Sequence, residues 1–170
     1  MDLNVLVLPG DGIGPEVIRE AVKVLAAVTD LAGHRLDAVE GLIGGAALSV
    51  AGKPLPPETR DRARSAGAVL LGAVGSPEFD SLTPDRRPER GLLDLRQTMG
   101  VFANLRPVRT WAPLAGASPL KDAVVTGTDL LIVRELTGGL YYGRPRGLFG
   151  DGPAAEAVNT MQYSYGEVER

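Results

Sequence analysis

The 170-residue sequence contains no cysteine and a single histidine. Without cysteine, disulfides, thiolate zinc sites and cysteine nucleophiles are excluded. Aromatic residues make up only 5% of the chain. Any chemistry therefore depends on oxygen ligands, arginine, tyrosine or a bound cofactor.

A basic surface and a long apolar run are also missing. The formal net charge is −3 and the pI is near 5.2, whereas binding to a nucleic-acid backbone needs clustered positive charge. The first apolar run, Leu3 to Leu8, is too short to span a bilayer and lacks the flanks of a secretory signal. We expect a cytoplasmic protein that binds neither nucleic acid nor membrane.

What the chain does have is an alternation of strand-like and helix-like segments. The runs at Leu3 to Leu8 and Ala68 to Val74 are typical of buried parallel strands, and a further strand is expected from Arg35 to Glu40. An amphipathic helix is expected to begin at Pro15. This order predicts an α/β fold, in which ligands bind beyond the carboxyl ends of the strands.

A glycine loop follows the first strand and contains Gly10, Gly12 and Gly14. Its spacing, G-x-G-x-G-P-E, differs from the dinucleotide-binding pattern G-x-G-x-x-G. We therefore favour a tight turn over a dinucleotide site. The long loop after the strand at Ala68, GSPEFDSLTPDRRPER, is either functional or a surface excursion.

Three arginines and a leucine form the candidate ligand clamp. Leu92 and Arg96 are one helical turn apart, Met99 continues their face, and Arg106 follows ten residues after Arg96. Arg134 ends an apolar strand that we expect to be buried, where an unpaired guanidinium is costly. The alternative for Arg96 is that its stem packs on the core and its head group extends into water.

The carboxy-terminal part predicts a projecting hairpin and then a helix start. Two aromatic-bearing stretches joined by a glycine-rich turn suggest a hairpin at about 138–163. Ser164 and Glu167 then form a capping box, and the sequence stops at Arg170. We expect that the chain is a fragment of a longer protein.

Several motifs, in this order, resemble the amino-terminal part of the 3-isopropylmalate dehydrogenase family, which belongs to the β-decarboxylating dehydrogenases. They are LPGDGIGPEV, LLGAVGSPEFD, RPERGLLDLRQTMGVFANLRPV, LIVRELTGGLYYGRPRG and AVNTMQYS. The resemblance implies a two-domain α/β fold, truncated here. Residues 1–101 would begin the first domain and residues 102–170 the second, with the hairpin as the dimerisation arm of a homodimer.

The resemblance also implies an activity and its residues. The reaction is NAD-dependent oxidation and decarboxylation of (2R,3S)-3-isopropylmalate in leucine biosynthesis, with Mg²⁺ or Mn²⁺ as the metal. Arg96, Arg106 and Arg134 match the clamp for the substrate carboxylates, and Leu92 matches the residue facing the isopropyl group. Tyr141 matches the catalytic tyrosine that protonates the enolate.

The cofactor segment implied by the resemblance comprises Ser76, Pro77 and Glu78, with Glu89 where substrate and nicotinamide meet. Ser76 stands where the related pattern often has glycine. The family's catalytic lysine, metal-binding aspartates and adenosine loop would lie beyond Arg170, so no metal ligand is assigned and the chain alone is expected to be inactive.

Two alternatives remain. A related enzyme could act on isocitrate, homoisocitrate or tartrate, although Leu92 favours an alkyl group. A truncated relative could instead serve only for binding or dimerisation.

Overall fold

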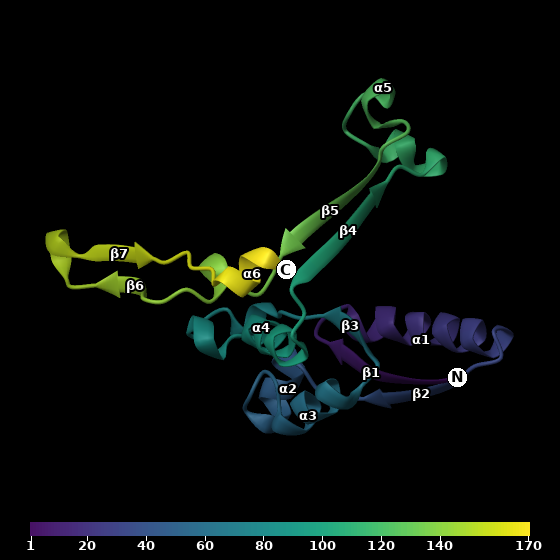
Figure 1. The fold of residues 1–170 in the computed structure, drawn as a ribbon, viewed down its shortest axis with the longest axis horizontal. Helices are drawn as coiled ribbons and strands as arrows, with labels where there is room; N and C mark the ends of the chain where they lie inside the picture. Colours follow the sequence, from purple (N-terminus) through teal and green to yellow (C-terminus); the bar gives the residue numbers. More distant parts are fainter. The chain divides into compact units, whose positions relative to one another are not determined.

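The computed structural model describes residues 1–170 and divides into two compact units (Figure 1). Unit 1 is Met1–Gly100 and unit 2 is Val101–Arg170. The assignment of these units to the domains of a larger fold stays a prediction. None of the helices combines the length and the apolar character that a membrane span requires.

Unit 1 is built on a parallel sheet of three strands in the order β2-β1-β3. The strands are β1 (Asp2–Gly10), β2 (Arg35–Glu40) and β3 (Ala68–Ala73). The central strand β1 is buried over most of its length, whereas β3 is only half-buried. The predicted α/β class and the three predicted strands are confirmed, but the predicted full burial of β3 is wrong in this chain.

Helices cover both faces of this sheet because the side chains of β1 alternate between them. On one face, Val5 and Val7 pack with Ile18 of α1 (Gly14–Leu31). On the other face, Leu6 and Leu8 join a cluster that is also formed by residues of α3 (Pro57–Ser65), α4 (Pro88–Met99) and their neighbouring loops. The short α2 (Gly44–Ala51) contacts α4 and β1.

The glycine loop after β1 is a tight turn, as predicted. Gly10 and Gly12 have φ values of +74° and +55°, which favour glycine. A Cβ atom on Gly14 would lie 2.1 Å from the carbonyl oxygen of Pro9, so the helix begins directly against the strand.

The long loop after β3 folds on itself. It contains two 3₁₀ turns, η1 (Pro77–Phe79) and η2 (Pro84–Arg86). The guanidinium of Arg87 donates hydrogen bonds to the carbonyl oxygens of Leu82 and Asp80, at 3.0 and 2.7 Å. The predicted long loop is therefore present, and Arg87 binds two of its carbonyl groups.

Asp11 connects three loops at the carboxyl edge of the sheet. Its carboxylate accepts hydrogen bonds from the backbone N–H groups of Gly45, Ala46 and Gly75, at 2.9, 2.8 and 2.8 Å. Only 6% of the residue is exposed. A buried carboxylate is tolerated here because three donors replace its water, two of them at the amino end of α2.

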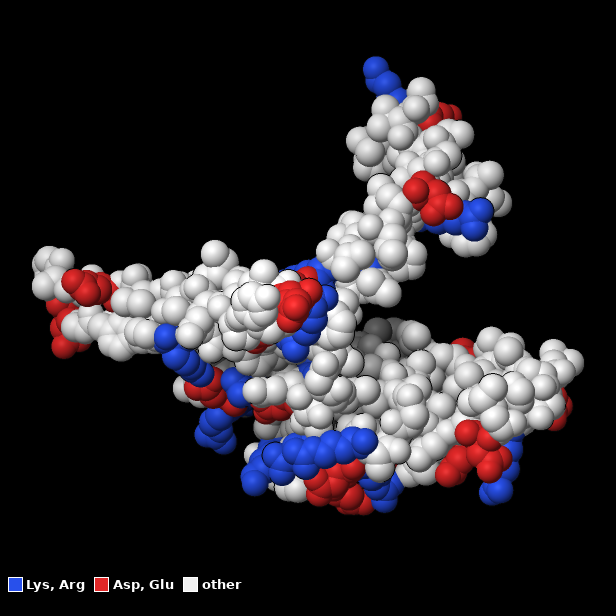
Figure 2. All heavy atoms as spheres, in the orientation of Figure 1, with Lys and Arg blue, Asp and Glu red and all other residues white.

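Unit 2 begins with an antiparallel pair, β4 (Ala103–Arg109) and β5 (Asp129–Glu135). The intervening segment contains η3 (Ala112–Ala117) and α5 (Asp122–Val125). Both strands are largely exposed, and uncharged atoms cover most of this ribbon in Figure 2. The prediction that β5 is a buried strand is wrong: its apolar residues have no covering layer in unit 2.

The rest of unit 2 contains the predicted hairpin. The turn η4 (Gly139–Tyr141) leads into β6 (Arg146–Phe149), which pairs antiparallel with β7 (Glu156–Asn159) through η5 (Gly152–Ala154). The last helix, α6 (Tyr165–Glu169), starts with the predicted capping box. At its end, Arg170 donates a hydrogen bond to the Thr137 hydroxyl at 2.8 Å.

Replacing Asp11 should destabilise unit 1. Asp11→Ala leaves three backbone donors unsatisfied at about 1–3 kcal/mol each, so we expect a loss of about 3 kcal/mol or more. Asp11→Asn, which keeps one acceptor oxygen, should lose less. Urea unfolding followed by circular dichroism measures both, with the exposed Asp30→Ala as control. Equal stability of Asp11→Ala and Asp30→Ala would contradict this role.

The pH dependence of α6 follows from Glu167. Its pKa lies below the ordinary value, chiefly because its carboxylate accepts the backbone N–H of Ser164 and secondly because of its side-chain hydrogen bond with Ser164. A lowered pKa stabilises the cap above the unfolded-state pKa, and this contribution is lost as pH falls through the folded-state pKa. We expect the α6 amide signals in NMR spectra to move toward coil values on acidification. In Glu167→Gln this pH dependence should disappear.

Candidate functional site

Two of the three predicted clamp arginines lie on one face of the β4–β5 pair. In the register, Asn104 is opposite Arg134 and Arg106 is opposite Ile132. Cross-strand partners share a face, so Arg106 and Arg134 are diagonal neighbours. The Arg106 Nε donates to the Asn104 side-chain oxygen at 3.0 Å, which orients its guanidinium along this face.

Tyr141 lies against one of these arginines, Arg134. The guanidinium carbon of Arg134 is 5.2 Å from the centre of the Tyr141 ring, within cation–π range. Both residues line an open cavity of about 860 Å³ together with Arg146 and Asn159. Unit 2 thus brings a phenol and positive charge together, an arrangement suited to an anionic ligand that needs a proton.

The remaining clamp residues lie on α4 of unit 1. Leu95 of this helix is buried in the core, and Met99 packs against the same cluster. Leu92 and Arg96 are half-buried, beside that packed face. Met99 therefore belongs to the core and does not extend the ligand face as predicted. Leu92 and Arg96 keep their expected spacing of one turn.

The predicted cofactor residues lie at the carboxyl edge of the unit 1 sheet. Ser76 and Glu78 line a small pocket of about 270 Å³ with Asp11 and Ser49. Glu89, at the start of α4, is close to the same loop, since a Cβ atom on Gly75 would lie 2.9 Å from its carboxylate. This edge is where ligands bind in parallel sheets. Pro77 begins η1 and turns the chain beside the pocket.

The donor set decides which part of a dinucleotide fits this pocket. The backbone N–H groups at the amino end of α2, which could otherwise hold a phosphate, already bind Asp11. The pocket presents carboxylate and hydroxyl oxygens, which suit ribose hydroxyl groups and repel a pyrophosphate. The residues present therefore fit sugar hydroxyl groups better than phosphate groups. No group of three or more potential metal ligands lies together in the chain.

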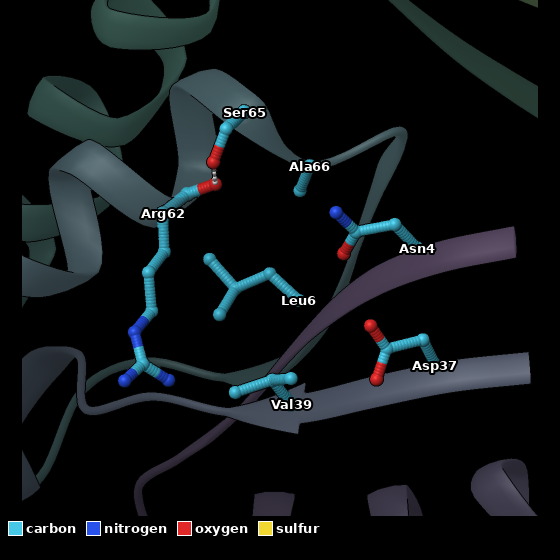
Figure 3. Close-up of a pocket in the computed structure, with 7 residues that line it drawn as sticks. All are labelled: Asn4, Leu6, Asp37, Val39, Arg62, Ser65 and Ala66. Atoms are coloured by element: carbon cyan, nitrogen blue, oxygen red, sulfur yellow. Dashed lines mark hydrogen bonds between the residues drawn. The ribbon is translucent and has the colours of Figure 1, made fainter.

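A second pocket, of about 290 Å³, opens elsewhere on unit 1 (Figure 3). It is lined by residues of β1, β2, α3 and the start of the following loop: Asn4, Leu6, Asp37, Val39, Arg62, Ser65 and Ala66. Asn4 lies near the amino end of β1, away from the edge where ligands bind. Arg62 is ion-paired with Glu58 at 2.8 Å. No predicted site residue lines this pocket.

Sequence reasoning did not single out Asp11. The available signal was an acidic residue between two glycines directly after a buried strand, where a charged side chain needs nearby donors. Its three partners are 34, 35 and 64 residues away in the chain. Only the tertiary structure identifies them.

Comparison with known proteins supports the family resemblance that the sequence motifs indicate. Residues 4–170 match the model of the isocitrate/isopropylmalate dehydrogenase family. The 3-isopropylmalate dehydrogenases of Shouchella clausii and Heyndrickxia coagulans are 52% and 54% identical over the whole chain. That of Salinibacter ruber is 56% identical over 96% of it. The chain spans 47%, 46% and 44% of the length of these three curated relatives.

Solved structures show the same fold. A β-decarboxylating dehydrogenase from Thermococcus kodakarensis matches 94% of the chain, which covers 41% of that structure, with a TM-score of 0.62 and 34% identity. An isocitrate dehydrogenase from Methylococcus capsulatus matches 92% of the chain, which covers 42% of that structure, with a TM-score of 0.69 and 28% identity. From its motifs, its fold and the match over residues 4–170, the chain belongs to the isocitrate/isopropylmalate dehydrogenase family.

Proposed function

We propose that the chain is the amino-terminal part of an NAD-dependent 3-isopropylmalate dehydrogenase that acts in the cytoplasm in leucine biosynthesis. The observation that supports this most directly is the grouping of Arg106, Arg134 and Tyr141 in unit 2. The relatives at 52–56% identity carry this name as well. NAD would accept the hydride from the substrate's C2 hydroxyl group.

Arg96, Arg106 and Arg134 would bind the two carboxylates of the substrate. Each guanidinium is a planar fork that matches a carboxylate with two parallel hydrogen bonds. The shared face of Arg106 and Arg134 supports joint action, since their diagonal position lets both reach one small dianion. Charge on the arginines would also stabilise the enolate left when the β-carboxylate departs as CO₂.

Tyr141 would then donate its phenolic proton to the enolate carbon. Its side chain is 42% exposed, so the hydroxyl can reach a ligand. The adjacent guanidinium of Arg134 stabilises the phenolate that results from the proton transfer. Ser76, Pro77, Glu78 and Glu89 would contact the nicotinamide riboside half of NAD. A Mg²⁺ or Mn²⁺ ion would be bound by residues outside this chain.

Leu92 is the residue proposed to select the substrate. It is half-buried and is not part of the two core clusters, which leaves its side chain available to an alkyl group. Isocitrate, homoisocitrate and tartrate share the malate core but carry a polar group at this point, and a leucine would leave that group unpaired. An isopropyl substituent is therefore favoured.

The β6–β7 hairpin is proposed to pair with its counterpart in a homodimer. It is a two-stranded ribbon with exposed apolar side chains, among them Leu148 and Phe149 at 78% and 47% exposure. A two-stranded hairpin is marginally stable alone in water. Pairing with a second copy would cover these side chains.

The activity is tested by joining the chain to the part of a relative that lies beyond the matched length. The 170-residue chain and a chimera, in which residues 1–170 are continued by the carboxy-terminal part of the Heyndrickxia coagulans relative, are assayed for isopropylmalate-dependent formation of NADH. We expect turnover by the chimera and none by the chain alone. A folded, dimeric chimera without turnover would contradict the proposed function, and turnover by the chain alone would contradict its expected inactivity.

Removing a clamp arginine should weaken substrate binding in the active chimera. A charged hydrogen bond contributes about 1.5–3 kcal/mol, so Arg106→Ala or Arg134→Ala should raise KM for isopropylmalate about tenfold or more. Arg109→Ala is the matched control, because Arg109 is on the same strand but on the opposite face. An equal effect of all three substitutions would exclude a specific clamp.

Shortening Leu92 should reduce the preference for the alkyl group. In Leu92→Ala, kcat/KM for isopropylmalate is expected to fall by about tenfold to a hundredfold, because apolar contact with the isopropyl group is lost. Turnover of malate, which lacks that group, should change little. Steady-state kinetics with both substrates give the ratio of kcat/KM for isopropylmalate to kcat/KM for malate. If both values fall equally, Leu92 supports α4 and does not select the substrate.

A further inference from the structure

Tyr141 lies on a single 3₁₀ turn, η4, that is held by the base of the β6–β7 hairpin. The Gly139 N–H donates to the carbonyl oxygen of Gln162 at 2.9 Å, and a Cβ atom on Gly139 would lie 2.4 Å from the Tyr163 hydroxyl. A turn this short has few internal hydrogen bonds, and its last carbonyl groups need partners from outside.

Arg146 supplies those partners. Its Nη1 donates to the carbonyl oxygens of Leu140 and Tyr141, at 3.4 and 3.3 Å. Arg146 is the first residue of β6 and is paired with Asn159 of β7. The guanidinium thus connects the hairpin ladder to the backbone of the residue that carries the phenol.

We propose that Arg146 is a positioning residue for Tyr141: it fixes the backbone of η4 so that the Tyr141 ring stays against Arg134. Tyr141 is then held at two points: Arg146 binds its backbone carbonyl oxygen, and Arg134 lies over the face of its ring. The assignment of Tyr141 as proton donor rests on the proposed function, whereas the position of its ring does not.

The position of the ring can be measured on the 170-residue chain by NMR with ¹³C-labelled tyrosine. The chain has four tyrosines, and Tyr141→Phe identifies the signal of Tyr141. Replacing Arg134 by Met removes the cation from the ring and should shift this signal. In an Arg146→Met background, the same replacement should shift it by less than about half as much, because the ring has already left Arg134.

Arg146→Lys keeps a positive charge and a hydrogen-bond donor. In an Arg146→Lys background, Arg134→Met should therefore still shift the Tyr141 signal by most of the amount seen in the unchanged chain. Phe149 and Glu156 form the pair of the β6–β7 ladder farthest from η4. Their amide signals report on the hairpin itself and should stay in place. Arg109→Met, in the same unit, is the control and should leave Tyr141 unchanged.

The proposal is overturned if Arg134→Met shifts the Tyr141 signal equally in both backgrounds. It is also overturned if the amide signals of Phe149 and Glu156 move together with the Tyr141 signal in Arg146→Lys as well as Arg146→Met, since Arg146 would then hold the hairpin as a whole. Because no turnover is required, these results stay separate from the outcome of the NADH assay.

Discussion

The carboxylate of Asp11 is the constraint on which the candidate cofactor edge depends. It stands at the end of the central strand β1 and binds N–H groups from the loops that follow β2 and β3. The Asp11 carboxylate adds to a backbone hydrogen bond from the Asp11 N–H to the Ala73 carbonyl oxygen, at 2.7 Å. One buried charge therefore helps to shape the pocket that contains Ser76 and Glu78.

The same interaction explains why the amino end of α2 does not offer a phosphate site. In a dinucleotide fold, the amino end of a helix is left open for the pyrophosphate. Here the Asp11 carboxylate binds the backbone N–H groups at the amino end of α2. The edge that remains is acidic and hydroxylated, which favours sugar hydroxyl groups over phosphate.

Unit 2 is organised differently, with little burial and a site built on two ribbons. Strand register alone brings Arg106 and Arg134 to one face, and cation–π contact adds Tyr141. The apolar residues of β4 and β5 remain exposed, so packing does not explain the placement of these arginines. Their position follows from the alternation of side chains along paired strands.

The local elements of the fold were predictable from the residues because each is encoded by a short pattern. Periodicity identified β1, α1 and β2, and the capping box of Ser164 and Glu167 identified the start of α6. The motifs also led to the family and to the candidate site residues. Burial was less predictable: β5 is apolar enough to be read as a core strand, yet within unit 2 nothing covers it.

What the sequence by itself determined was therefore the order of the elements and the identity of the reactive side chains. The tertiary structure alone decided which of them meet. Asp11 reaches a donor 64 residues away, and the pairing of β4 with β5 brings Arg106 and Arg134 to one face. Such contacts depend on register and loop closure, which arise from the packing of the whole unit and leave no local pattern in the chain.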